Sequence, residues 1–282
     1  MLLGYNTNGF AHHGLLDAIE VLAEIGYRSA AITLDHHSLN PYSASPAEEL
    51  IAAANCLRQH NMRTVIETGA RFLLDPRTKH EPTLLSGDRA ARERRIDFLR
   101  RAIEIAAALK SDCVSLWSGI LRDDIGDVAA FERLATSLVP VLKYATDLGV
   151  TIGFEPEPGM LIDTMERFEQ LRERIDCECF QLTLDIGHLH CLGETPIDDQ
   201  VRQWRHQIVN VHIEDMRAGV HDHLMFGEGE IEFEPILRAF REIDYTGGLH
   251  VELSRHSHDA PAVARRAYEI LSSLISSIDS SA

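Results

Sequence analysis

The chain alternates between short apolar runs and longer segments of helical periodicity, and the alternation is repeated eight times. The apolar runs are rich in β-branched residues and lack regular polar alternation, which is typical of parallel strands covered on both faces. The predicted strands are 2–5, 28–34, 63–67, 112–117, 150–155, 181–184, 208–213 and 248–253. The predicted helices that follow them are 15–25, 47–60, 89–109, 128–148, 165–173, 196–206, 234–243 and 260–276.

Eight consecutive strand–helix units predict an α/β fold in the form of a single (β/α)8 TIM barrel, one domain over residues 1–282. The length agrees, because such barrels run to roughly 250 residues. An open doubly wound sheet is the alternative. It is disfavoured because no glycine-rich phosphate loop follows the first strand. The longest irregular stretch, 68–88, follows the third strand and is long enough to indicate a functional loop.

The formal net charge of −17 argues against nucleic acid or an anionic membrane as a partner, because phosphate binding needs clustered Lys and Arg. No run of 18 apolar residues is long enough to span a bilayer. The five cysteines are an odd number in a large chain, so a disulfide framework is not expected. We expect a cytoplasmic enzyme with a small-molecule substrate.

Four consecutive predicted strands carry a metal-ligand type at the carboxyl end, where (β/α)8 barrels place their active sites. These residues are Glu155, Asp185, His212 and Glu252. Three carboxylates gathered at one rim would repel one another unless a cation lay between them. One imidazole with three carboxylates suits a single divalent ion, Mn²⁺, Mg²⁺, Co²⁺ or Zn²⁺. The pattern therefore predicts a divalent-metal site.

Other side chains at the same rim are candidates for shaping the substrate pocket. Asn6, Glu67 and Trp117 follow the first, third and fourth strands, and the indole is suited to stacking on a sugar face. Each has a simpler interpretation: a turn hydrogen bond for Asn6, an ion pair with Arg71 for Glu67, and core packing for Trp117. Glu157 is expected to cap the next turn, with a place beside the metal as the alternative.

Several motifs in the C-terminal half resemble those of the xylose isomerase-like TIM barrel superfamily, in its sugar (phosphate) isomerase/epimerase branch. The matching pieces are Glu155-Pro156, Asp185-x-x-His188, Val211-His212-Ile213-Glu214-Asp215, Gly227-Glu228-Gly229-Glu230-Ile231 and Tyr245-x-Gly247-Gly248-x-x-Val251-Glu252. The barrel periodicity extends the resemblance over the whole chain. Relatives in this superfamily also include inosose dehydratases, other sugar lyases and an endonuclease of abasic DNA.

The resemblance implies a role for each matching residue. Glu155 and Glu252 match the two glutamates that bind the metal and act as acid and base, while Asp185 and His212 match the other two ligands. His188 matches a substrate-binding histidine. Arg217 lies near a substrate-contacting arginine of the family, although its spacing here is only approximate. His223 stands where a loop histidine reaches metal or substrate in the endonuclease and related branches.

The chemistry implied is isomerisation or epimerisation of a sugar or related polyol. A proton is removed next to a metal-bound carbonyl, and the resulting enediolate is reprotonated by the same or the opposing glutamate. A lyase or dehydratase acting on a keto-sugar or keto-inositol is the main alternative, and a nuclease is disfavoured by the charge. Arg255 is a candidate for binding a carboxylate or phosphate of the substrate. The family resemblance also suggests a homodimer or homotetramer.

Overall fold

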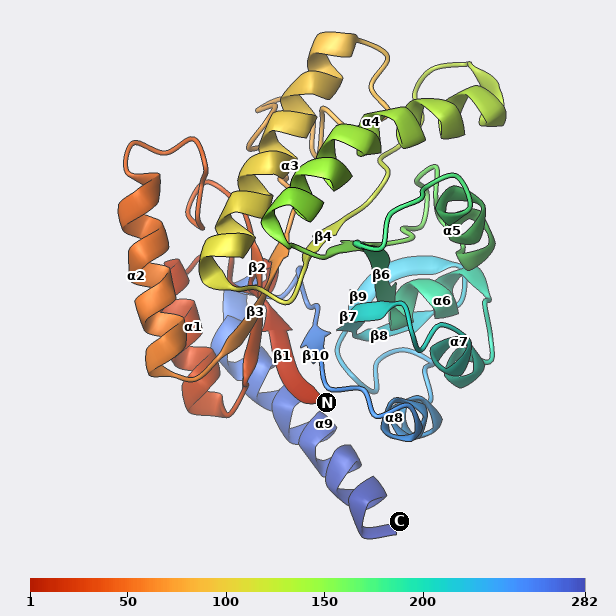
Figure 1. Cartoon of the computed structure of the whole chain (residues 1–282). Coiled ribbons are helices and arrows are strands. Elements are labelled where there is room, and N and C mark those ends of the chain that lie inside the picture. The colour runs from red at the N-terminus through yellow and green to blue at the C-terminus, as the bar shows by residue number, and fades with distance from the viewer. Residues whose placement is uncertain (282) are drawn as a thin grey trace.

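Within residues 1–281, which this computed structural model describes, eight parallel strands close into a barrel (Figure 1). They are β1 (Leu2–Asn6), β2 (Ser29–Thr33), β3 (Arg63–Glu67), β4 (Val114–Leu116), β5 (Ile152–Phe154), β6 (Phe180–Asp185), β7 (Ile208–Ile213) and β10 (Gly248–Val251). Around the barrel the order is β1, β10, β7, β6, β5, β4, β3 and β2. The predicted (β/α)8 TIM barrel is confirmed, and the alternative open sheet is wrong.

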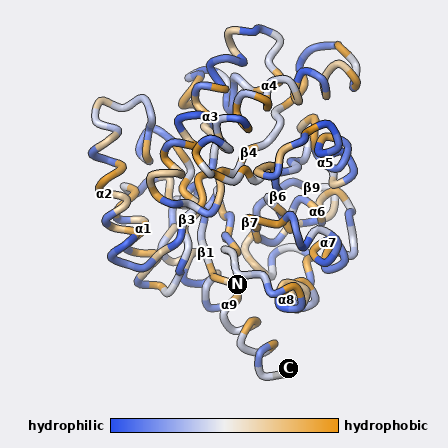
Figure 2. Tube along the Cα trace, viewed as in Figure 1, coloured by the Kyte–Doolittle hydropathy of each residue, from blue (hydrophilic) through white to orange (hydrophobic). Residues whose placement is uncertain are grey.

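Helices surround the barrel on the outside (Figure 1). They are α1 (Leu15–Ile25), α2 (Pro46–Gln59), α3 (Arg89–Leu109), α4 (Gly126–Leu148), α5 (Met165–Arg172), α6 (Ile186–Leu192), α7 (Ile197–Gln203), α8 (Phe233–Glu242) and α9 (Ala260–Ser281), with short 3-10 turns η1 (Thr7–Phe10) and η2 (Ser257–Asp259). Hydrophobic and hydrophilic residues alternate around their turns (Figure 2), and α8, for example, buries Phe233, Leu237 and Phe240 against the barrel. None of the helices in the described part of the chain is long and apolar enough to cross a membrane.

The region after β6 differs from the prediction. One helix was expected over 196–206, whereas the structure has the short helix α6 directly after β6, followed by α7. Asp185 is both the last residue of β6 and the N-cap of α6, because its side chain accepts a hydrogen bond from the His188 backbone N–H at 2.8 Å. Apolar periodicity does not predict α6, since seven residues make only two turns.

A second difference is an antiparallel hairpin, β8 (Asp215–Arg217) and β9 (Val220–Leu224), between β7 and α8. The sequence of β9, Val-His-Asp-His-Leu, has a polar centre. A search for apolar runs therefore does not identify it as a strand. The Asp215 carboxylate fixes the ends of the hairpin. It accepts hydrogen bonds from the backbone N–H groups of Met216, Gly227, Gly229 and Ile231.

The barrel interior holds a buried imidazole as well as apolar side chains. His250 points inward from β10, and its ring lies against Gly4 and Gly248, where a Cβ atom would collide with it. Its Nε2 lies 2.8 Å from the Ser29 hydroxyl, and its Nδ1 lies 2.7 Å from the Asn210 amide oxygen. Burial lowers the pKa of His250 to about 3, so the ring is neutral at ordinary pH. The barrel axis thus carries a hydrogen-bonded chain that leads from His250 toward Asn210.

Replacing the N-cap of α3 tests how this long helix is secured. The Asp88 carboxylate accepts from the backbone N–H groups of Ala90 and Ala91, both at 3.2 Å. We expect Asp88→Ala to lower the free energy of unfolding by about 1 kcal/mol, as measured by urea denaturation. Asp124→Ala, at an exposed position in the loop before α4, is the matched control and should change it by less than about 0.5 kcal/mol. Equal effects of the two substitutions would contradict the capping role.

Candidate active site

A cavity of about 480 Å³ opens at the carboxyl ends of the barrel strands. Its volume lies within the range of roughly 300–1,000 Å³ typical of small-molecule sites. Three predicted ligands, Glu155, His212 and Glu252, line it. Arg71 and His80, from the long segment after β3, also line it, so this irregular stretch does contribute to the cavity wall.

The structure brings the four predicted metal ligands together. Glu155 follows β5, Asp185 ends β6, His212 lies in β7, and Glu252 follows β10. These strands are successive neighbours in the barrel, and Asp185 pairs in register with His212. One ligand atom of each residue lies within 4.8 Å of the corresponding atoms of the other three. The four residues that the sequence places at successive strand ends therefore form one cluster in the structure.

His212 is the centre of this cluster. Its Nδ1 lies 3.0 Å from Glu155 Oε1 and 3.0 Å from Glu252 Oε2, and its Nε2 lies 2.9 Å from Glu67 Oε1. Burial disfavours the charged imidazole, but Glu155, Glu67 and Glu252 outweigh burial and raise the pKa of His212 well above its usual value. In the metal-free protein the imidazolium therefore balances part of the negative charge.

The donor set fits a divalent cation. The Asp185 Oδ1 atom is used by the cap of α6, whereas its Oδ2 atom is buried and has no hydrogen-bond partner among the described residues. Because Glu67 accepts a hydrogen bond from His212 Nε2, the Nδ1 lone pair is left for a metal. This is the arrangement in which a carboxylate orients a ligating histidine. Three carboxylate oxygens and one imidazole nitrogen form a set for Mn²⁺, Mg²⁺, Co²⁺ or Zn²⁺.

The two glutamates of the cluster differ in their acidity. Burial raises the pKa of Glu155 to about 8, in spite of the opposing effect of His212. Burial also acts on Glu252, but the charge and hydrogen bond of His212, together with His223 and His188, lower the pKa of Glu252 below its usual range. Two nearby carboxyl groups whose pKa values are pushed apart are suited to serve as acid and base.

Asn210 connects the cluster to the barrel interior. Its Nδ2 lies 3.1 Å from Glu67 Oε1 and 3.2 Å from His212 Nε2, while its Oδ1 accepts from His250. Sequence analysis did not single out Asn210, although it stands two residues before His212. Residues two apart on a strand share a face, so this spacing is a signal that could have identified it.

The predicted pocket residues Asn6, Glu67, Trp117 and His223 all line the cavity. Trp117 is 8% exposed, with the Arg95 guanidinium 4.6 Å from its ring centroid and His80 packed edge-on at 5.5 Å. Glu67 does not form the alternative ion pair with Arg71; it holds His212 instead. Asn6 makes the turn hydrogen bond that was its simpler interpretation, accepting from Asn8 N–H at 3.1 Å.

Two predicted substrate-binding residues lie elsewhere. Arg217 is exposed on β8, outside the cavity wall, and donates to the backbone carbonyl of Glu228. The hairpin, which the sequence did not reveal, turns it away from the site. His188 is buried and does not line the cavity either. It lies behind His221, which lines the cavity and which sequence analysis did not assign to a role.

The remaining candidates also differ from expectation. Glu157 does not cap a turn; its carboxylate lines the cavity, with Oε2 3.9 Å from His188 Nε2 and Oε1 3.8 Å from His221 Nε2. Arg255 lines the cavity as predicted, but its guanidinium is ion-paired with Asp222. A substrate anion at Arg255 would therefore compete with this carboxylate.

The sequence model of the xylose isomerase-like TIM barrel family matches residues 19–274. An L-ribulose-5-phosphate 3-epimerase (UlaE) of Shigella flexneri is 23% identical over 202 residues, which cover 71% of this chain and 71% of that protein. An inosose dehydratase of Clostridium botulinum is 29% identical over 136 residues, which cover 42% of this chain and 45% of that protein.

Among solved structures, the IolI protein with a bound zinc atom superposes with a TM-score of 0.80 at 18% sequence identity, covering 99% of both chains. At this identity the likeness shows a shared fold. Together with the family match, it accounts for the closed barrel and for a cavity at the carboxyl ends of its strands.

Metal affinity should depend on pH in a defined direction. At pH values below the raised pKa of His212, a cation must displace the proton from Nδ1, so affinity falls as the pH falls. For each proton released we expect about a tenfold loss of affinity per pH unit. Calorimetric titration of chelator-treated protein with Mn²⁺ at pH 6 and pH 8 measures this. An affinity that is unchanged between these values would contradict the assignment of His212 as a ligand.

Proposed function

This chain belongs to the xylose isomerase-like TIM barrel family, and we propose that it is a divalent-metal-dependent epimerase or isomerase of a small sugar or related polyol. The observation that carries the proposal is the convergence of Glu155 and Glu252 on one nitrogen of His212 from separate strands, each at 3.0 Å. The UlaE relative, named as an epimerase of a ketose phosphate, supports the substrate class.

The proposed reaction begins with removal of a proton from the carbon next to a carbonyl. A bound divalent cation would supply polarisation of that carbonyl, held by Glu155, Asp185, His212 and Glu252. Glu252 is ionised and serves as the base, and Asn8 Nδ2 fixes its Oε1 atom by a hydrogen bond of 2.7 Å. Glu155, which approaches the same His212 nitrogen from β5, donates a proton to the opposite face. In the reverse direction the two glutamates exchange roles.

Other residues hold the substrate in place for this transfer. Trp117 and His80, which pack edge-on with ring centroids 5.5 Å apart, form an aromatic part of the cavity wall, and such a wall suits the apolar face of a sugar ring. Asn6 and Glu157 offer polar atoms for hydroxyl groups along the same cavity. The polar lining therefore agrees with a small polyhydroxylated substrate.

Substitution of each glutamate separates the two proton transfers. We expect Glu155→Gln and Glu252→Gln each to reduce turnover by at least about 10²-fold, because each removes an acid–base group. In D₂O, Glu155→Gln should still exchange the proton next to the carbonyl without forming the epimer, whereas Glu252→Gln should do neither. NMR of ketoses and keto-inositols incubated with the metal-loaded enzyme reads both outcomes.

Glu234→Gln, at an exposed position on α8 where Glu234 pairs with Arg238, is the matched control and should leave turnover unchanged. The metal content of each variant is measured in parallel, so that loss of the ion is distinguished from loss of the base. Normal turnover in either site variant would contradict the two-base mechanism. Activity that is indifferent to chelation would contradict the metal requirement.

A dehydratase of a keto-inositol or keto-sugar is the second candidate, favoured by the similarity to an inosose dehydratase. The same site chemistry begins it, since loss of water from a carbonyl compound also starts with removal of the adjacent proton. The NMR experiment distinguishes the two, because a dehydratase yields a product without the elements of water and an epimerase yields an isomer. The oligomeric state and cellular location stay predictions.

A further inference from the structure

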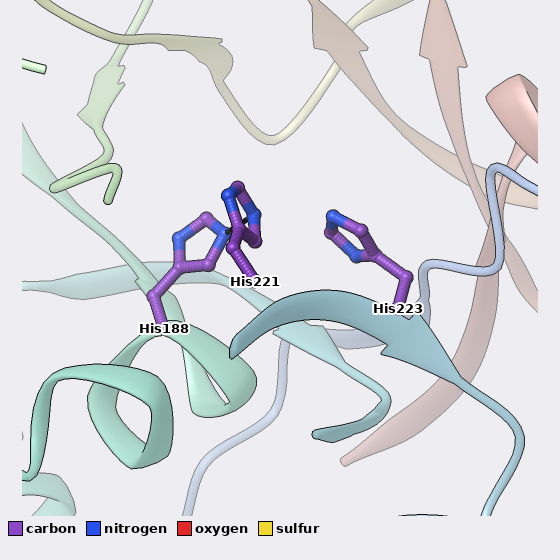
Figure 3. A group of neighbouring side chains, drawn as sticks. All are labelled: His188, His221 and His223. Carbon is purple, nitrogen blue, oxygen red and sulfur yellow. Dashed lines mark hydrogen bonds between the residues drawn. The ribbon is translucent and has the colours of Figure 1, made fainter. Parts of the chain in front are cut away.

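Two of the five cysteines lie together at the amino end of β6, away from the active site. Cys177 and Cys179 belong to the loop 173–179 between α5 and β6, whereas Asp185 and the histidines beside the active-site cavity (Figure 3) lie at the carboxyl ends of the strands. A turn brings the two cysteines together, because the backbone N–H of Phe180 donates to the carbonyl of Cys177 at 3.1 Å. Their Sγ atoms are 2.9 Å apart, and both thiols are free.

The last turns of α4 lie against the pair and supply hydrogen-bonding groups. The Thr146 hydroxyl oxygen is 3.6 Å from Cys177 Sγ and 3.4 Å from Cys179 Sγ. Cys179 Sγ is also 3.7 Å from the backbone carbonyl oxygen of Leu142, to which its S–H group can donate. These contacts hold the two sulfur atoms against one helix.

The two thiols differ in acidity. Burial disfavours the Cys177 thiolate, but hydrogen bonds from Cys179, from the Thr146 hydroxyl and from the backbone N–H groups of Cys179 and Phe180 outweigh burial and lower the pKa of Cys177. Burial and the neighbouring Cys177 raise the pKa of Cys179. A thiol with a lowered pKa beside one with a raised pKa is suited to react first, while the second stays protonated.

The other three cysteines provide an internal comparison. Cys56, Cys113 and Cys191 are buried, and burial raises the pKa of each thiol above its usual value. Buried thiols of this kind are inert, because the thiolate is the reactive form. Cys177 is half-buried and its pKa is lowered, so it is the cysteine of this chain that is most suited to act as a nucleophile.

Cys177 lines a cavity of about 460 Å³ between α4 and the loop after α5, whereas Cys179 is not among its lining residues. The volume is sufficient for a small molecule. The walls combine apolar side chains with charged groups of both signs, among them Lys143 and Asp147, and this mixture suits a small peptide-like molecule. Close packing would explain two half-buried sulfur atoms, but it would not explain why the sulfur with the lowered pKa is the one that faces a cavity.

We propose that Cys177 and Cys179 form a redox-active dithiol that exchanges with a low-molecular-weight disulfide of the glutathione type. The Cys177 thiolate attacks one sulfur of the small disulfide, so that a mixed disulfide forms, the S–S bond of the reagent breaks and one thiolate leaves. Cys179 then loses its proton to that thiolate, and its sulfur attacks Cys177 Sγ. The Cys177–Cys179 disulfide forms and the second small thiolate leaves, so the protein loses two electrons and the reagent gains them.

This modification site does not depend on which reaction the barrel catalyses. A disulfide between residues that are two apart in the sequence closes a small, strained ring, and strained disulfides are easily reduced. We therefore expect excess reduced glutathione to reverse the modification.

Peptide mass spectrometry tests the site without reference to activity. The full chain, reduced and freed of reductant, is incubated with oxidised glutathione, quenched with acid, and then unfolded and alkylated. The peptide that contains Cys177 and Cys179 should lose two hydrogen atoms and take up no alkyl group, whereas Cys56, Cys113 and Cys191 should all be alkylated. Excess reduced glutathione should restore both thiols. A wild-type chain in which Cys177 and Cys179 are both still alkylated would overturn the proposal.

Two variants identify the attacking and the resolving thiol. Cys179→Ser should keep one glutathionyl group on Cys177, because no second thiol remains to displace it. Cys177→Ser should react at least about tenfold more slowly, because the pKa of Cys179 is raised and Cys179 does not line the cavity. Cys191→Ser, at a buried thiol outside the pair, is the matched control and should form the disulfide as the wild-type chain does. Glutathionylation of Cys177→Ser at the wild-type rate, or of Cys191 as fast as of Cys177, would contradict the assigned roles.

Discussion

Mutual repulsion among Glu155, Asp185 and Glu252 is the constraint on which the site depends. Their oxygens are gathered within a few ångströms in a buried space, and such a group is costly unless a positive charge lies among them. In the metal-free protein the protonated His212 supplies part of that charge. The same nitrogen that holds this proton is the one that a cation needs, so proton and metal compete for one position. Either a proton or a cation at this nitrogen therefore offsets part of the carboxylate charge.

The support for His212 extends far below the cavity. Glu67 on β3 accepts from its Nε2, and Asn210 on β7 donates to the same Glu67 carboxylate. Asn210 accepts in turn from His250, whose ring fits between glycines of β1 and β10. Each member of this chain is buried and hydrogen-bonded, which fixes the ring plane and the tautomer of His212. Part of the barrel interior that would otherwise be apolar is used to orient one ligand.

Much of the fold could be predicted because strand periodicity and helix length are long, regular signals. The clustering of the four candidate ligands followed from the fold, since adjacent parallel strands end at one rim. Features that depend on only a few residues could not be predicted from periodicity. The helix α6 is too short for a periodic signal, and β9 carries histidines where a hydrophobic pattern requires apolar residues. The position of Arg217 outside the cavity wall is set by the hairpin, and the contact of His188 with His221 depends on that same hairpin.

The hairpin β8–β9 is anchored to the segment that follows it by one side chain. A single carboxylate, Asp215, gathers four backbone N–H groups at its base, and the hairpin forms no ladder with the barrel sheet. The hairpin carries His221 and His223, which line the cavity. The Gly219 N–H of the hairpin turn donates to the carbonyl of Cys191 in α6, so the hairpin is held on that helix and no barrel strand takes its registry from it. One side of the cavity is thus built by a small module outside the barrel sheet, whereas the clustered carboxylates and His212 are placed by the barrel strands themselves.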